Sequence, residues 1–142
     1  MSFSDGEVIA LTAHNGLYWS RVNRGGNRTN TIEASKNSLD RDSEFTVVNL
    51  KNGKIALKAR SNGLYLSRIN RGSINSIEAA KEVIDLSSEF KVIDRPLNKI
   101  ALLADNDLYI SVIDRGGIPF IEAEKNQIDI WSEFTVTVVR KK

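Results

Sequence analysis

Three copies of one pattern divide this sequence, and the repetition constrains the fold more than any local feature does. Each copy opens with the motif Gly/Asp-Leu-Tyr-x-Ser-x-x-Asn/Asp-Arg-Gly, continues with Ile-Glu-Ala and closes with Ser-Glu-Phe. The motif tyrosines, Tyr18, Tyr65 and Tyr109, follow one another at intervals of 47 and 44 residues. A period of this length indicates one supersecondary unit per repeat, with a core formed where the units pack together.

The composition is ordinary for a soluble globular protein and rules out several kinds of chemistry. The 142 residues fit one domain; 41% of them are hydrophobic and 27% are charged. A net charge of +2 gives no field strong enough to favour a nucleic-acid partner. The absence of cysteine excludes disulfides and thiolate zinc sites, and the single histidine, His14, cannot form a histidine metal cage. We expect no cofactor, no metal and no enzymatic activity.

The sequence shows no pattern typical of a secretory signal peptide or of a transmembrane segment. The first seven residues contain neither a basic segment nor an apolar stretch before a cleavage site, which is unlike a secretory signal peptide. No window approaches 18 consecutive apolar residues, so we expect no transmembrane segment and no membrane insertion. The predicted location is cytoplasmic, or outside the cell after release without a signal peptide.

Each repeat is predicted to contain four short strands. In the second repeat, residues 54–59 alternate between apolar and polar side chains, as a half-buried strand does. Asn62 and Gly63 form a turn of the kind that favours a hairpin. Residues 64–69 and 76–80 form the next two strands, with a break at 70–73, and residues 88–93 form the fourth.

Four strands in each of three repeats predict an all-β fold of twelve strands with pseudo-threefold symmetry, which is a β-trefoil. A propeller with four-stranded blades needs at least four of them, so three repeats of about 45 residues exclude it. We predict one β-trefoil domain over residues 1–142, with repeats at about 7–50, 51–95 and 96–138.

Apolar positions that recur in all three repeats predict the core, because a repeated fold must agree with itself there. Residues expected to line the barrel are Ile9, Leu11, Ile55, Leu57, Ile100 and Leu102. Residues expected to meet near the axis are Phe45, Phe90 and Phe134, with Leu39, Ile84 and Ile128 close to them.

Repeated polar residues are more informative about function, since surface positions need not match. The Asn-Arg-Gly or Asp-Arg-Gly loops and the glutamates of the Ile-Glu-Ala strands recur together, and they form the candidate carbohydrate-binding sites. These residues are Asn23, Arg24, Gly25, Glu33, Asn70, Arg71, Gly72, Glu78, Asp114, Arg115, Gly116 and Glu122.

Two interpretations of the arginines remain open. Each Arg can pair internally, with the glutamate of its own repeat or with the aspartate at position 40, 85 or 129. Alternatively, each Arg can point into solvent as a hydrogen-bonding fork that spans neighbouring sugar hydroxyls. The glutamates at positions 33, 78 and 122 form a second threefold polar set with the lysines at positions 36, 81 and 125, for which solvated strand edges or local ion pairs are expected. Trp19 and Trp131 are not repeated, which favours a place in the core or at the barrel rim over one as a sugar platform.

The repeats resemble a known superfamily. An apolar strand, then Asn62-Gly63-Leu64-Tyr65-Leu66-Ser67, then Glu78-Ala79 and a closing Ser88-Glu89-Phe90 strand, is similar to the repeat of the fascin-like β-trefoils. That group includes fascins, hisactophilins and, more distantly, amaranthin-type agglutinins. The chain departs from the first two, because fascins join four trefoils and hisactophilins are rich in histidine.

A single small trefoil with repeated polar loops is most like a lectin. The sequence therefore predicts a non-enzymatic, carbohydrate-binding protein with up to three related sites, whose partners are glycans or glycoproteins. The alternative is an actin-binding or other protein-binding module of the fascin-like type. Whether the chain forms a homo-oligomer is left open.

Overall fold

The computed structural model describes residues 2–25 and 29–141, which form twelve strands and three short 3-10 helices. The strands of the first repeat are β1 Val8–Thr12, β2 Tyr18–Val22, β3 Thr31–Lys36 and β4 Phe45–Lys51. Those of the second are β5 Lys54–Ala59, β6 Tyr65–Arg71, β7 Ile74–Lys81 and β8 Phe90–Arg95. Those of the third are β9 Lys99–Leu103, β10 Tyr109–Arg115, β11 Ile118–Lys125 and β12 Phe134–Arg140.

Six strands close into a barrel. Strand β1 pairs with β12, β12 with β9, β9 with β8, β8 with β5, β5 with β4, and β4 returns to β1. All of these pairings are antiparallel. The closed ring leaves no barrel strand with a free edge, which removes the main route by which sheets aggregate.

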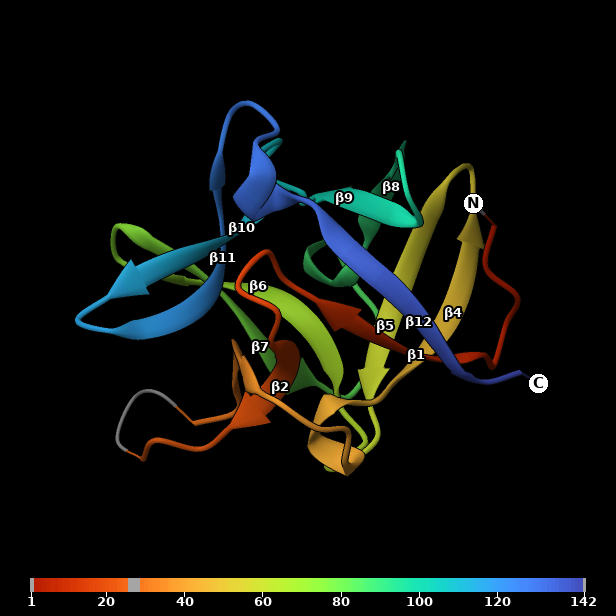
Figure 1. The fold of residues 1–142 in the computed structure, drawn as a ribbon, viewed down its shortest axis with the longest axis horizontal. Coiled ribbons are helices and arrows are strands. Elements are labelled where there is room, and N and C mark those ends of the chain that lie inside the picture. Colours follow the sequence, from red (N-terminus) through yellow and green to blue (C-terminus); the bar gives the residue numbers. More distant parts are fainter. Residues whose placement is uncertain (1, 26–28, 142) are drawn as a thin grey trace.

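The other six strands form three hairpins that close one end of the barrel. The hairpins are β2–β3, β6–β7 and β10–β11, and their second strands contact one another in all three combinations. In Figure 1 the hairpins lie to the left of the barrel strands, and both termini lie on the barrel side. Six barrel strands and three capping hairpins make a β-trefoil, which confirms the predicted fold.

Local sequence explains the hairpin geometry. Each hairpin has a register shift after its motif tyrosine, at Tyr18, Tyr65 and Tyr109. The turns of the second and third hairpins place Gly72 and Gly116 at φ values of 72° and 65°, where a side chain would be strained. The motif arginines of these two repeats end β6 and β10 rather than breaking them, so both strands run further than predicted.

The predicted core is confirmed where it concerns the barrel. All six of the predicted barrel-lining side chains are buried, and Phe45, Phe90 and Phe134 are completely so. The ring of Trp19, also fully buried, lies edge-on to Phe134 with centroids 4.8 Å apart. The placement of Leu39 near the axis is wrong, since its side chain is 38% exposed. Its counterparts Ile84 and Ile128 are only half-buried, because this segment runs outside the barrel.

The 3-10 helices that follow this segment were not predicted. They are η1 Arg41–Ser43, η2 Leu86–Ser88 and η3 Ile130–Ser132. An aspartate caps each one, and a serine hydroxyl three residues later accepts a hydrogen bond from the backbone N–H of the cap. A lysine four residues before each cap binds its carboxylate, in the pairs Lys36–Asp40, Lys81–Asp85 and Lys125–Asp129. The lysines therefore form local ion pairs, but the glutamates expected in the same polar set are buried and not on a solvated edge. None of the helices in the described residues has the length or apolar character to span a membrane.

We expect the helix-capping carboxylate of Asp85 to contribute to stability in a pH-dependent way. Hydrogen bonds from the Ser87 hydroxyl and from Lys81 lower the pKa of Asp85 from 3.8 to about 2. A carboxyl whose pKa is lower when folded stabilises the protein above its unfolded pKa, and this stabilisation is lost as the pH falls through the folded value. Asp85→Asn should lower the free energy of unfolding at pH 7 by about 1 kcal/mol or less, since the group is half exposed.

Urea unfolding of the wild type and Asp85→Asn between pH 7 and pH 2 tests this expectation. The difference between the two proteins should shrink as the pH falls from about 4 to about 2. Glu82→Gln, which removes an exposed carboxylate nearby, controls for the change in net charge. A difference that stays constant over this range would contradict the assignment.

Candidate functional site

Each motif arginine forms a two-pronged ion pair with the glutamate of its own repeat. Arg24 donates from Nε and Nη2 to the two carboxylate oxygens of Glu33, at 2.6 and 2.8 Å. Arg115 makes the same two bonds to Glu122, both at 2.8 Å. Arg71 likewise donates from Nε and Nη2 to Glu78. The parallel geometry of guanidinium and carboxylate makes these the strongest kind of side-chain hydrogen bond in proteins.

The glutamates of these pairs are buried. The exposed fraction of the side chain is 0% for Glu33, 2% for Glu78 and 0% for Glu122, whereas the arginines are 30–40% exposed. Hydrogen bonding to the carboxylates raises the pKa of Arg24, Arg71 and Arg115 above the ordinary value, against the opposing effect of burial. The sequence left two interpretations of these arginines open, and the structure confirms the one in which each arginine pairs with the glutamate of its own repeat.

The remaining residues of the predicted sites shape the hairpin turns. Asn23 accepts a hydrogen bond from the backbone N–H of Gly25, as in an Asx turn, and Asp114 accepts one from the backbone N–H of Gly117, three residues on. Asn70 is exposed at the same position of the second hairpin. Carbohydrate binding by these loops stays a prediction, and it cannot use the glutamate carboxylates while the pairs are intact.

The internal pairs predict a large loss of stability on truncation. Arg71→Ala leaves the Glu78 carboxylate buried without its partner, so the free energy of unfolding should fall by about 3 kcal/mol. Lys81→Ala breaks an exposed pair and should change it by about 0.5 kcal/mol or less. Chemical denaturation of both variants provides the comparison. Equal effects would contradict the internal pair, and Arg71→Met/Glu78→Leu should recover most of the loss.

A different set of positions lies where neighbouring repeats meet. At the junction of repeats one and two, Arg21 of β2 donates to Ser61, Asn30 and Asp42, with Nε–Oγ and Nη1–Oδ1 distances of 2.7 Å to the first two. At the junction of repeats two and three, Arg68 of β6 donates to Asp105 and to Asn75. A guanidinium group therefore occupies both junctions.

The third junction has no such arginine. Val112 of β10 stands at the position of Arg21 and Arg68, as the shared register of the three hairpins shows. The residues equivalent to the hydrogen-bond partners of Arg21 and Arg68 also differ at this junction. Pro119 stands opposite Asp114, where Asn75 stands opposite Asn70, and Trp131 takes the place of Asp42 beside the helix cap. In place of Ser61 and Asp105 stands His14, whose ring lies edge-on to Trp131 with centroids 5.0 Å apart.

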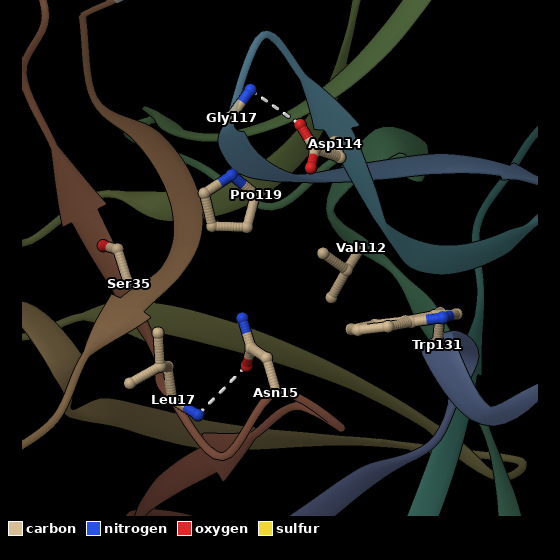
Figure 2. Close-up of a pocket in the computed structure, with 8 residues that line it drawn as sticks. All are labelled: Asn15, Leu17, Ser35, Val112, Asp114, Gly117, Pro119 and Trp131. Atoms are coloured by element: carbon tan, nitrogen blue, oxygen red, sulfur yellow. Dashed lines mark hydrogen bonds between the residues drawn. The ribbon is translucent and has the colours of Figure 1, made fainter.

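These replacements leave a cavity of about 640 Å³ between repeats three and one. This volume lies within the range of small-molecule sites. Figure 2 shows the indole ring of Trp131 on one side and Ser35 on the other. The lining residues are Asn15, Leu17, Ser35, Val112, Asp114, Gly117, Pro119 and Trp131.

Polar groups at the cavity are held in place by hydrogen bonds. The amide of Asn15 accepts from the backbone N–H of Leu17 at 3.0 Å and donates to the carbonyl of Ala34 at 3.1 Å, which fixes its orientation. The carboxylate of Asp114 accepts from Gly117 at 2.7 Å (Figure 2). No group of His, Asp or Glu side chains within residues 2–25 and 29–141 is arranged to hold a metal ion.

Sequence reasoning reached only part of this site. Asp114 belongs to the predicted set and Trp131 was weighed as a sugar platform, but the cavity that they share was missed. The available signal was Val112, a valine where both other repeats carry arginine. The predicted sites consist of residues that recur in all three repeats. A cavity lined by residues that differ from their counterparts in the other repeats was therefore not predicted.

Comparisons with known proteins support the fold and leave the family open. No family model and no curated protein matches the sequence. Among solved structures, a designed threefold-symmetric protein, ThreeFoil, has a TM-score of 0.80 at 12% identity, over 93% of this chain and 99% of that one. The BEL β-trefoil has a TM-score of 0.78 at 14% identity, over 98% and 97%. A Polyporus squamosus lectin has a TM-score of 0.76 at 6% identity, over 97% of this chain and 51% of that one. These likenesses show a β-trefoil; the fascin-like resemblance stays a prediction.

Proposed function

We propose that this protein is a carbohydrate-binding lectin without enzymatic activity, whose partners are glycans or glycoproteins. The observation that carries the proposal is the junction cavity, which combines the indole wall of Trp131 with the carboxylate of Asp114. A sugar ring has an apolar face of C–H groups and an edge of hydroxyls. An aromatic ring beside an oriented polar group matches both parts of the sugar.

The chemistry of the lining residues supports a sugar over a fully apolar ligand. An ionised carboxylate is an acceptor with several lone pairs, so Asp114 can accept from sugar hydroxyls while it holds Gly117. The Asn15 amide retains one N–H beyond the bond to Ala34. Because both groups are positioned before binding, little conformational entropy is lost when the ligand arrives.

The geometry favours one such pocket per chain. Arg21 and Arg68 occupy the corresponding junctions of the other repeats and bind neighbouring side chains there. A cavity of about 500 Å³ lies beside Arg68, but most of the side chains that line it are charged or polar, and it has no aromatic wall. A single pre-formed pocket of this kind would bind a small sugar weakly. Strong attachment to a glycosylated surface would then require several chains or several sites, with gains of about 10² to 10⁴ from multivalency.

The lectins among the structural neighbours are consistent with this function, although the low identity carries no residue over. The Polyporus squamosus lectin has the sialylated trisaccharide Neu5Acα2-6Galβ1-4GlcNAc bound in its structure. Another neighbour, covered over 33% of its length, is an endo-β-galactosidase that releases a GlcNAc-galactose unit. The trefoil architecture therefore occurs in proteins that act on or bind glycans.

A glycan array with labelled wild-type protein and Trp131→Ala tests the proposal. The wild type should bind a defined class of glycans, and the variant should lose at least about tenfold in affinity because the stacking wall is gone. Ile130→Ala is the matched control, since Ile130 lies on the same 3-10 helix, is 52% exposed and does not line the cavity. It should bind like the wild type.

The other outcomes separate the alternatives. Glycan binding that survives in Trp131→Ala would keep the lectin function and move the site, with the Asn-Arg-Gly loops as the next candidate. A wild-type protein that binds no glycan would contradict the proposal. Co-sedimentation with actin filaments would then test the protein-binding alternative.

A further inference from the structure

We propose that the junction cavity is specific for an uncharged sugar carrying an acetamido group, an inference that rests on the proposed carbohydrate-binding function. The charge of the cavity, its apolar surface and its oriented polar groups all bear on the choice of sugar. Each of these narrows the class of sugar that the cavity accepts.

The charge of the cavity disfavours acidic sugars. Asp114 is the one ionisable side chain among the eight lining residues, and its pair with Gly117 is a backbone hydrogen bond that leaves the negative charge uncompensated. A sugar carboxylate or sulfate placed beside it would be repelled, because like charges at short range disfavour each other. The neighbouring Arg115 is committed to the buried Glu122.

The cavity has apolar surface in addition to the ring of Trp131. Besides Trp131, the cavity is lined by Val112, Pro119 and Leu17, which have no polar side-chain atoms. Sugar hydroxyls placed against these three side chains would lose their hydrogen bonds to water without replacement. A methyl group gains from the same contact, so the ligand should carry a methyl-bearing substituent. An acetamido group and a 6-deoxy carbon both provide one.

The polar groups favour the acetamido group of these two. An amide presents one donor and one acceptor in a fixed plane. Asp114 supplies an acceptor for the amide N–H, and the free N–H of Asn15 supplies a donor for the amide carbonyl. A 6-deoxy sugar can place its methyl group on the apolar wall, but it must bring separate hydroxyls to Asp114 and Asn15. One acetamido group offers the methyl, the donor and the acceptor together in a single rigid unit.

The symmetry of the protein supplies a built-in test of this site. Val112→Arg installs the side chain that both other junctions carry, directly in the cavity. We expect the variant to fold, since the backbone at this position already accommodates arginine twice, at Arg21 and Arg68. It should lose sugar binding because the guanidinium group occupies the cavity and can stack on Trp131.

Isothermal titration calorimetry with a panel of monosaccharides measures the specificity. The panel contains N-acetylglucosamine, N-acetylgalactosamine, glucose, galactose, fucose, galacturonic acid and N-acetylneuraminic acid. The two N-acetylated hexosamines should bind at least about tenfold more tightly than glucose, galactose or fucose, a typical discrimination for one well-placed apolar group with satisfied polar partners. The two acids should bind more weakly still, and Asp114→Asn should narrow the gap between N-acetylneuraminic acid and the hexosamines.

The control for Val112→Arg is Ile130→Arg, which adds the same charge to an exposed position outside the cavity. Thermal unfolding of both variants confirms that they are folded. Loss of binding in Val112→Arg alone supports the site. Binding that persists in Val112→Arg would overturn it.

Different results would contradict the acetamido specificity and the proposed lectin function. If glucose, galactose or fucose bind as tightly as the N-acetylated hexosamines, or if acidic sugars bind best, the acetamido inference is wrong and the lectin function stands. If the panel and the array show no binding at all, the proposed function fails and the inference fails with it.

Discussion

Three buried carboxylates constrain the hairpin cap of this trefoil. Glu33, Glu78 and Glu122 lie on β3, β7 and β11, the strands that contact one another around the pseudo-threefold axis. A carboxylate in such a place is tolerated only with a well-aligned counter-charge and further hydrogen bonds. Each hairpin supplies its own arginine for this purpose, and in the first repeat the Thr31 hydroxyl adds a third donor. The polar motif that recurs in the sequence is therefore largely accounted for by the fold.

This constraint separates structural arginines from those at the junctions. The arginines at the ends of the hairpins neutralise the buried glutamate of their own repeat, whereas Arg21 and Arg68 bind side chains of the next repeat. Losing a junction arginine removes partners from exposed or half-buried polar groups and leaves no buried charge behind. The junctions can therefore change their residues at lower cost to stability than the cap can, and the third junction has done so.

The sequence predicted the architecture well because its strongest signals were periodic. Three copies of an apolar alternation fixed the number of strands, and the recurrence of Ile9, Leu57 or Phe90 placed them in the core. It could not decide between a paired and a solvent-facing Arg71, since that choice depends on which strand lies beside the arginine and how deep Glu78 sits. Leu39 was misplaced because its segment leads into an aspartate-capped 3-10 helix outside the barrel, a local feature whose cap was not recognised.

In a repeat protein, a distinct site can form where equivalent positions of the repeats carry different residues. At the third junction four positions differ together, since Val112, Pro119, Trp131 and His14 replace residues that form an arginine network elsewhere. Losing the arginine alone would leave its acceptors without that donor, at a small cost because the corresponding groups at the other junctions are exposed or half-buried. Replacing the acceptors as well removes that cost and turns a polar contact into a cavity with an apolar wall. The proposed sugar site therefore depends on several departures from the repeat at one junction and not on the residues that the three repeats share.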